Sequence, residues 1–400
     1  MEYIENYSIT IFGGDQRAFS GDILPDSIGI HIINSVNYSD VKDYTVKFTV
    51  EKGGGDVNES LVKTDMYGNA YTFWTLGTLT NNQTVNAEIF KPNGKLINTM
   101  KINAQAFNIS IWDTVTNGFE ININDIANDT INHQTFILAN NTVYKQDNPF
   151  YQWTNQNYSG SYLKSIKMNK AGIIYASSWY GDLYKSDNSN IYFVPCTKPD
   201  PNNFNYFEFS VTGTDHIWAT TTYTDLQCSR DGGNSWTSSS SGIFSGQKLG
   251  KIIQHKDGTL FLLTLQNGLY KSVNDGQNWT PLSSIDYIVD FCITNDGDLI
   301  VYRNYNAFQL LKSTNKGLSF TECYKLENNW QYFSNFETFR QYKSKYYVTI
   351  TGKGILETSD FETYTTFWDH PAVTRLFVTN DGTFIAKDDN YSNVYYRHLQ

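Results

Sequence analysis

The sequence predicts an all-β protein of two parts, a β-sandwich over residues 1–105 and a seven-bladed β-propeller over residues 106–400. Aromatic residues make up 16% of the 400 residues, whereas only 8 residues are proline, and aromatic side chains favour strands. Short apolar runs separated by turns such as Asp257-Gly258 indicate β-hairpins. From about residue 134 the chain repeats every 40 to 43 residues, the length of a four-stranded propeller blade.

The repeat is marked by a Lys-Ser-like step at the end of a predicted strand. These steps begin at Lys145, Lys185, Cys228, Lys271 and Lys312. An aromatic residue follows eight positions later, at Trp153, Phe193, Trp236, Trp279 and Phe320. A sixth, degenerate copy runs through Ser359, Asp360 and Phe367. Seven units result, beginning near residues 134, 161, 205, 248, 286, 332 and 372.

The two ends of the repeat predict how the ring closes. The first unit lacks a recognisable first strand, and the last unit stops after its third strand at 394–396. Pairing the last unit with an N-terminal strand drawn from 107–124 would remove its exposed edge. The candidate closing strands are 107–111 and 118–123.

The loop between the third and fourth predicted strands carries a motif. Residues 229–236 and 272–279 follow the pattern S-x-D/N-x-G-x-x-W, and 313–320 is a weaker copy. These segments resemble the Asp-box of bacterial neuraminidase-like (BNR) repeats, which also occurs in sortilin-type receptors and xyloglucan hydrolases. The motif residues are Ser229, Asp231, Gly233, Trp236, Ser272, Asn274, Gly276, Trp279, Ser313, Asn315, Gly317 and Phe320. Their hydroxyl, carboxyl and amide groups suit hydrogen bonds within the turn, so the resemblance implies a stabilising loop rather than a catalytic one.

Residues 1–105 resemble bacterial Ig-like domains of the invasin and intimin type. Matching segments occur in family order, among them 46–50, 53–55 and 74–77. Alternation places Val46, Phe48 and Val50, and likewise Tyr71 and Phe73, in the expected sandwich core. Trp74 is also expected in the core. The resemblance implies a spacer that holds a working domain away from a cell surface, with an adhesive role as the alternative.

A ligand is expected on the propeller face that carries the loops between strands 2 and 3 and between successive blades. Aromatic rings beside polar side chains suit sugars, because rings stack on C–H faces while hydroxyls take directed hydrogen bonds. The alternative is that several of these rings pack between blades. The candidate ligand-binding residues are Trp179, Tyr180, Tyr223, Arg303, Tyr305, Trp330, Trp368, His370 and Tyr391.

Catalysis has less support in the sequence. Asp369, Asp388 and Asp389 are candidate carboxylates for a glycoside hydrolase, but nothing fixes their spacing. A sialidase is disfavoured because it needs an arginine triad, and few arginines are available in the propeller. No cofactor or metal site is predicted. The Asp388-Asp389 turn is a candidate for Ca²⁺, with solvated turn residues as the alternative.

Charge and cysteine usage restrict the partners. The net charge of −10 repels phosphate backbones, so nucleic acid is not an expected partner. No run of 18 apolar residues predicts a membrane span. The four cysteines lie far apart without a C-x-x-C pair, and either free thiols or one disulfide fit them.

We therefore expect a monomeric, non-catalytic protein that binds a polysaccharide or an envelope protein through one propeller face. The resembled domains imply an extracellular or outer cell-surface location, with a leader or lipid anchor outside this sequence. A glycoside hydrolase and an assembly or scaffold factor are the alternatives.

Overall fold

All regular secondary structure in the described part of the protein is β-strand. The computed structural model describes residues 7–79, 81–107, 112–114, 123–129, 131–148, 152–155, 162–186, 192–199, 208–220, 226–244, 249–264, 268–282, 285–304, 307–327, 338–388 and 393–398. Every regular element in these ranges is a β-strand, so the all-β prediction is confirmed. The chain divides into two compact units, whose main segments are Met1–Asp113 and Trp153–Tyr396; the second unit also contains Thr114–Asp147.

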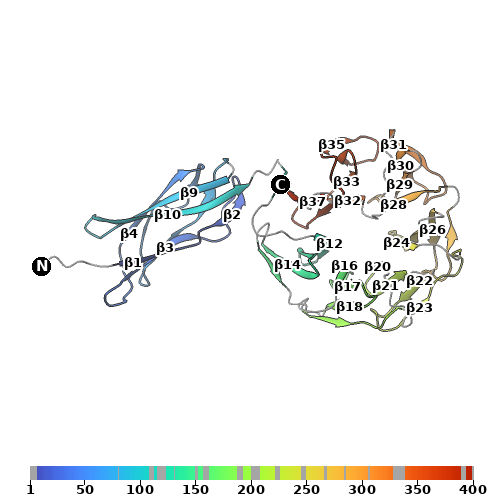
Figure 1. The fold of residues 1–400 in the computed structure, drawn as a ribbon, viewed down its shortest axis with the longest axis horizontal. Coiled ribbons are helices and arrows are strands. Elements are labelled where there is room, and N and C mark those ends of the chain that lie inside the picture. The colour runs from blue at the N-terminus through green and yellow to red at the C-terminus, as the bar shows by residue number, and fades with distance from the viewer. Residues whose placement is uncertain are drawn as a thin grey trace. The chain divides into compact units, whose positions relative to one another are not determined.

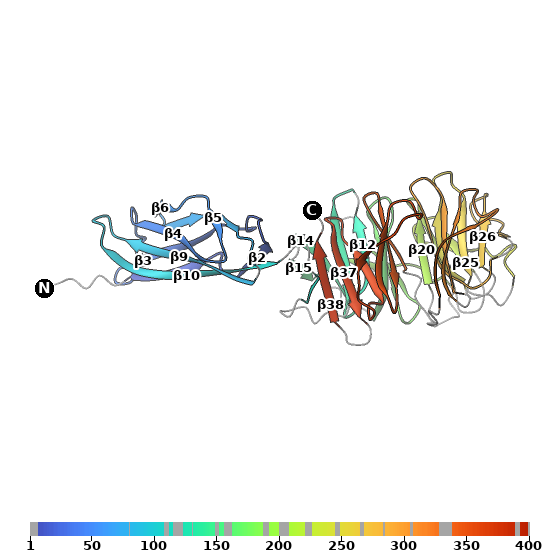
Figure 2. The same ribbon diagram turned by 90° about the horizontal axis from the view of Figure 1, so that it is seen from above.

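The N-terminal unit contains three sheets (Figure 2). The first has the order β1 (Tyr7–Phe12), β3 (Ile28–Asn34), β7 (Asn69–Thr72). The second has the order β2 (Gln16–Phe19), β10 (Leu96–Phe107), β9 (Asn81–Phe90), β4 (Thr45–Lys52), β6 (Leu61–Lys63), in which β2 and β10 pair in parallel. A third, two-stranded sheet pairs β5 (Gly55–Val57) with β8 (Trp74–Leu76).

The first two sheets share a buried core. Ile30 of β3, Phe48 of β4 and Ile89 of β9 belong to one hydrophobic cluster, and Trp74 is fully buried within it. The expectation for Tyr71 and Phe73 is wrong, because these rings are 52% and 45% exposed. Their neighbours Ala70, Thr72 and Trp74 are buried instead. Side chains alternate between the faces of a strand, so an error of one residue exchanges the buried set for the exposed set.

The second unit contains seven four-stranded sheets formed by described residues. Figure 1 shows them arranged as a ring, with the first strand of each sheet toward the inside. The first three sheets are β12 (Ile123–Asp129), β13 (Gln134–Ala139), β14 (Thr142–Asn148), β15 (Gln152–Asn155); β16 (Leu163–Met168), β17 (Ile174–Ser178), β18 (Leu183–Ser186), β19 (Phe193–Pro195); and β20 (Glu208–Thr212), β21 (His216–Thr220), β22 (Leu226–Ser229), β23 (Thr237–Ser238).

The next three sheets repeat this order. They are β24 (Leu249–Gln254), β25 (Leu260–Thr264), β26 (Gly268–Ser272), β27 (Thr280–Pro281); β28 (Ile288–Ile293), β29 (Leu299–Asn304), β30 (Ala307–Ser313), β31 (Thr321–Glu327); and β32 (Phe339–Tyr342), β33 (Lys345–Ile350), β34 (Gly354–Thr358), β35 (Thr365–Trp368). Neighbouring strands within these sheets pair antiparallel.

The last sheet closes the ring with a strand from the opposite end of the unit. Its order is β11 (Asp113–Thr114), β38 (Asn393–His398), β37 (Thr383–Asp388), β36 (Arg375–Val378). A closing strand from 107–124 was expected, but β11 lies between the two candidate segments. The first sheet also has a first strand, β12, which the repeat pattern did not reveal. Apart from 123 and 107, the candidate segments 107–111 and 118–123 lie outside the described residues.

The loops between the third and fourth strands of three successive sheets, residues 229–236, 272–279 and 313–320, share one hydrogen-bond pattern. We call them the corner loops. In the first, the Ser229 hydroxyl donates to Asp231 Oδ1 (2.8 Å) and accepts from the backbone N–H of Gly233 (2.8 Å). The pairs Ser272 with Gly276 (2.9 Å) and Ser313 with Gly317 (2.8 Å) repeat this contact. Each loop is therefore held by its own polar side chains.

The aromatic residues of the corner loops join neighbouring sheets. The indole N–H of Trp236 donates to the carbonyl of Thr197 (2.8 Å), and that of Trp279 to the carbonyl of Ser239 (2.8 Å), in each case in the segment that follows the preceding sheet. Gly276 has φ +73°, and a Cβ there would lie 2.4 Å from the Trp218 ring. Glycine is required at this position by both its backbone angle and the close packing.

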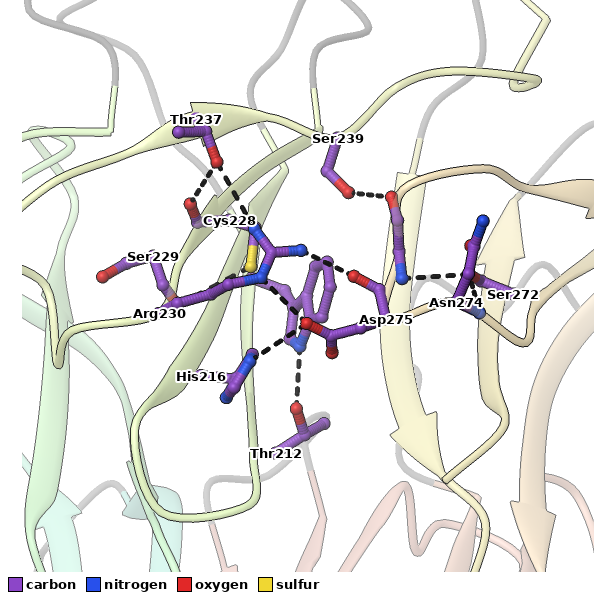
Figure 3. Close-up of polar contacts among 12 residues, drawn as sticks. Thr212, His216, Cys228, Ser229, Arg230, Thr237, Ser239, Ser272, Asn274 and Asp275 are labelled. Carbon is purple, nitrogen blue, oxygen red and sulfur yellow. Dashed lines mark hydrogen bonds and ion pairs between the residues drawn. The ribbon is translucent and has the colours of Figure 1, made fainter. Parts of the chain in front are cut away.

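A polar cluster links two successive corner loops (Figure 3). Arg230 donates from Nε to Asp275 Oδ2 (2.8 Å) and from Nη2 to the Asp275 carbonyl (2.6 Å). His216 Nε2 lies 3.2 Å from the same carboxylate. The guanidinium also lies 5.9 Å from the centroid of the Trp218 ring. This cluster lies between the third and fourth sheets, so it belongs to the packing of the ring.

All four cysteines are free thiols. Burial raises the pKa of Cys196 to about 11 and that of Cys228 to about 12. A thiol with so high a pKa is a poor nucleophile, because the thiolate is the reactive form. The cysteines therefore act as small packing residues.

Candidate functional site

A pocket of about 440 Å³ is formed by the first strands of five sheets. We call it the central pocket, because these strands line the inside of the ring in Figure 1. Strands β12, β16, β20, β24 and β36 contribute most of its wall. Its lining residues that carry the argument below are Asp125, Lys164, Lys167, Trp179, Glu208, Lys251 and Arg375.

The pocket extends along the first strands, since its lining runs from Asn124 to Asn128 in β12 and from Lys164 to Met168 in β16. Trp179, which also lines it, follows the end of β17. In an antiparallel sheet the start of strand 1 and the end of strand 2 lie at the same end. The corner loops connect strands 3 and 4 at the opposite end. The central pocket therefore reaches the side of the loops between strands 2 and 3 at Trp179.

Irregular backbone accompanies the pocket wall. Four first strands have a register shift near their beginning, between residues 123 and 125, 163 and 165, 249 and 252, and 288 and 290. A β-bulge re-aims the side chains beside it and is common next to functional sites. Lys164 and Lys251 lie within these irregular steps. The bulges thus set the direction of charged side chains at the pocket.

The charged side chains of the pocket are paired between neighbouring sheets. Lys167 donates to Asp125 (2.9 Å), and Lys164 donates to Glu208 (2.6 Å). Asp125 also accepts from the Ser165 hydroxyl (2.5 Å) and the Ile166 backbone N–H (3.0 Å). Each pair joins the first strand of one sheet to that of the next. Asp125 and Glu208 therefore accept hydrogen bonds from the first strand of a neighbouring sheet.

Similar contacts continue around the ring, and we call the whole set the hub belt. Lys251 pairs with buried Asp290 (2.5 Å), which also accepts from the backbone N–H of Thr338 (2.7 Å). Between the third and fourth sheets, Ser210 Oγ accepts from the Ile252 N–H (2.9 Å). The last and first sheets meet where Arg375 Nη1 donates to the carbonyl of Asn124 (3.3 Å). Polar contacts therefore tie the inner strands together.

Aromatic side chains lie beside the pocket. Trp179 is 47% exposed and lines the pocket, and Tyr180 next to it is 54% exposed. The ring of exposed Tyr162 meets that of Tyr180 edge to face, with centroids 5.9 Å apart. Lys164 Nζ lies 5.9 Å from the centroid of the Trp179 ring. We call Tyr162, Trp179 and Tyr180 the aromatic rim.

The other predicted ligand residues that the structure describes, Arg303, Trp368 and His370, are not part of the pocket lining. Arg303 donates from Nε to Gln309 (2.8 Å) on the adjacent strand of its own sheet. The Trp368 and His370 rings pack on each other, with centroids 4.4 Å apart, and both pack on Tyr395 of the last sheet. These two rings fit the alternative of packing between sheets. Tyr223, Tyr305, Trp330 and Tyr391 lie outside the described residues.

The two candidate catalytic carboxylates that the structure describes, Asp369 and Asp388, do not line the pocket. Asp369 is exposed, and Asp388 at the end of β37 is only 1% exposed. Neither is part of the pocket lining. Asp389 lies outside the described residues. Among the residues that the structure describes, no group of three or more His, Cys, Asp or Glu side chains is arranged to hold a metal ion.

Sequence reasoning missed most of the pocket wall. Lys164, Glu208, Lys251 and Arg375 lie in strands, whereas most residues that the sequence suggested were expected in loops. A usable signal was present, because each of these charged residues lies in the first half of the first strand of its sheet. In a ring of sheets the first strand faces the axis, so such residues converge on one place.

Part of the chain matches a known family model. Residues 202–333 match the DUF6242 beta propeller domain. The chain contains a β-propeller domain. The propeller prediction is thereby confirmed at the level of fold. No curated protein matches the sequence.

Solved structures of the same fold are distant in sequence. YCF48 from Cyanidioschyzon merolae has a TM-score of 0.52 and 10% identity, and the match covers 72% of this chain and 98% of that one. A structure described as the extracellular domain of a hybrid two component system from B. thetaiotaomicron has a TM-score of 0.56 and 11% identity; the match covers 96% of this chain and 58% of that one. At such identities the likeness concerns the fold alone. In the described part of this chain, no helix has the length and apolar character needed to cross a membrane.

Proposed function

We propose that this protein is a non-catalytic binding protein that recognises a glycan through the central pocket of its propeller. The observation that carries the proposal is the half-exposed Trp179 at the wall of a pocket rich in polar side chains. The pocket volume of about 440 Å³ lies within the range of small-ligand sites, roughly 300–1,000 Å³. An exposed indole beside hydrogen-bonding groups suits a sugar ring.

The hydrogen bonds that the pocket carboxylates already accept favour binding over hydrolysis. A glycoside hydrolase needs one carboxylic acid that donates a proton and a second carboxylate facing it. Asp125 already accepts four hydrogen bonds, and Glu208 accepts one from Lys164. These contacts favour positioning of a ligand over proton donation. A glycoside hydrolase is therefore the alternative that an activity assay must test.

The finer architecture is also part of the proposal. We propose that the seven sheets are the blades of a seven-bladed propeller over residues 106–400 and that the corner loops are Asp-boxes. We further propose that residues 1–105 form an Ig-like sandwich that acts as a spacer. The shared hydrogen-bond pattern of the corner loops supports the first part, and the common core of the two N-terminal sheets supports the second.

The proposed location is extracellular or at the outer cell surface. Two structural neighbours are described as extracellular domains of hybrid two component systems from B. thetaiotaomicron. A spacer domain joined to a glycan-binding propeller suits such a location.

A protein partner is the second candidate, which would make the molecule an assembly or scaffold factor. One of the matched structures is YCF48 with a bound peptide, with a TM-score of 0.52. A peptide could use the same polar wall, since backbone amides both donate and accept hydrogen bonds.

The proposed function is tested by a glycan array followed by calorimetry and by a reducing-sugar assay on each bound polysaccharide. We expect binding without sugar release, and Trp179→Ala should weaken binding by about tenfold or more. Tyr192→Ala is the matched control, because Tyr192 is an exposed aromatic residue directly before β19 of the same sheet and outside the pocket lining. Sugar release would indicate the hydrolase. Absence of glycan binding would rule out the glycan proposal.

A further inference from the structure

The aromatic rim extends beyond the central pocket. Trp179 lines the pocket, whereas Tyr162 and Tyr180, which are 59% and 54% exposed, are not part of the lining. Tyr162 directly precedes β16, and Tyr180 lies in the turn between β17 and β18, at the same end of the second sheet. The two tyrosines therefore continue the aromatic surface of Trp179 outside the pocket.

The turn that carries Trp179 and Tyr180 is held by hydrogen bonds. The Ser178 hydroxyl accepts from the backbone N–H groups of Tyr180 (3.1 Å) and Asp182 (3.0 Å), and the Ser178 N–H donates to the carbonyl of Asp182 (2.9 Å). Asp182 also pairs with Lys198 (2.8 Å), which follows β19. The two exposed rings thus project from a turn that is fixed to its own sheet. A ligand does not have to order this turn on binding, which removes one cost of association.

Tyr162 is attached to the same turn. Its carbonyl accepts from the Trp179 N–H (2.9 Å), and its ring meets that of Tyr180 with centroids 5.9 Å apart and planes at 76°. Edge-to-face contact is a favourable arrangement of two rings, so the tyrosines form one surface next to the indole. Each tyrosine also carries a hydroxyl that both donates and accepts hydrogen bonds. Such a surface suits the C–H face and the hydroxyl groups of a sugar unit.

We infer that Tyr162 and Tyr180 form a second subsite for the sugar unit next to the one in the central pocket, which rests on the glycan-binding function proposed above. A unit held inside the pocket contacts Trp179 but not the two tyrosines, because neither lines the pocket. The next unit of the same chain meets them, since Trp179 belongs both to the pocket and to the rim. Contiguous exposed rings, unlike single ones, mark an interaction surface. The protein therefore recognises a segment of two or more sugar units.

The experiment measures how affinity depends on the length of the glycan. The probes are malto-, cello-, manno- and galacto-oligosaccharides of one to four units, and binding is measured by titration calorimetry on the full chain. In at least one series we expect affinity to rise by about tenfold or more from one unit to two or three, because the added unit gains the contacts of the tyrosines. Equal affinity at all lengths would overturn the inference and leave the glycan function standing. Failure of every probe to bind would overturn both.

Variants show whether the gain with length arises at the tyrosines. Tyr180→Ala should remove most of this gain, about tenfold, and leave the affinity for a single unit within about twofold of that of the unaltered chain. Trp179→Ala should weaken binding of single units and longer chains alike. Tyr180→Phe keeps the ring and should keep most of the gain. Tyr192→Ala is the control, because Tyr192 is an exposed tyrosine directly before β19 and outside the pocket lining.

Tyr162→Ala is a second, independent test of the subsite. Tyr162 lies before β16 and not in the turn, so its replacement leaves the hydrogen bonds of Ser178 in place. This variant should also reduce the gain with length while retaining the affinity for a single unit. If both alanine variants keep the full gain, the further sugar units bind elsewhere and the inference is wrong.

Discussion

At the scale of single residues, one position in the corner loops has a left-handed backbone, and its side chain contacts the neighbouring sheet. Asp275 has φ +54° and Lys316 has φ +58°, where glycine is usual. Each side chain reaches the preceding sheet, since Asp275 contacts His216 and Lys316 contacts Asp257. The contact of Lys316 lowers the pKa of Asp257 below its ordinary value. A charged residue is tolerated here because its side chain bridges two sheets.

Substitutions at Asp275 separate strain from contact. Asp275→Ala removes the contacts to His216 and Arg230 but keeps a left-handed non-glycine residue, whereas Asp275→Gly relieves the strain. We expect the alanine variant to be less stable than the glycine variant by about 1 kcal/mol in urea unfolding.

Asp296 provides the control for this comparison. It is an exposed turn residue without positive φ, so Asp296→Gly should be less stable than Asp296→Ala by about 0.4–1 kcal/mol. The same order at both positions would contradict the role assigned to the backbone of Asp275.

At the scale of elements, the first strand of each sheet has two tasks. Its apolar residues fill the space between sheets, as Phe291 of β28 does in a cluster with Phe261 and Val301. Its charged residues form the hub belt. Burial of an ion pair stabilises only when both partners are present, because a lone buried charge is costly. The belt therefore makes the inner strands that it joins depend on one another.

Removal of one belt lysine tests this dependence. Lys251→Met leaves the fully buried carboxylate of Asp290 without its ammonium partner, so the free energy of unfolding should fall by about 3–5 kcal/mol. Lys345→Met is the control, because Lys345 and Glu357 form a pair of similar length (2.7 Å) with a solvent-exposed lysine. That change should cost at most about 1 kcal/mol.

A second variant distinguishes the unpaired charge from general disruption. Asp290→Asn in the Lys251→Met background should recover part of the lost stability, because it removes the unpaired carboxylate. Additive losses in urea unfolding of the double variant would show that the two residues act independently.

At the scale of the whole molecule, the propeller ring is completed by a strand of two residues. Strand β11, Asp113–Thr114, pairs with β38 and so covers the edge of the last sheet. An open edge exposes unpaired backbone groups and promotes association. The short closing strand thus joins the beginning of the propeller to its end.

Backbone substitution in β11 tests the closure in the full chain. The double variant Asp113→Pro and Thr114→Pro removes two backbone donors, which should cost about 1–2 kcal/mol and lower the Tm by several degrees. The double alanine variant keeps these donors and should unfold close to the unaltered chain. Equal Tm values for the two variants in calorimetry would show that β11 pairing contributes nothing to the ring.

The sequence by itself determined the class of fold and the repeat, because both depend on local patterns. Alternation, turn residues and the Lys-Ser steps are readable within a few residues of each other. The predicted unit starts at 161, 248 and 286 therefore lie close to the observed first strands. These patterns could not show which face of β7 is buried. Tyr71 and Ala70 both fit a strand, and only packing against the other sheet decides which of them is buried.

Only the tertiary structure decided where the candidate site lies. Asp125, Lys167 and Glu208 are far apart along the chain, and their positions in the strands do not by themselves show which side chains meet. They become a site because the ring brings successive first strands around one axis, where side chains from different sheets meet. Trp179 could be proposed from its type and loop, but its polar partners come from that convergence.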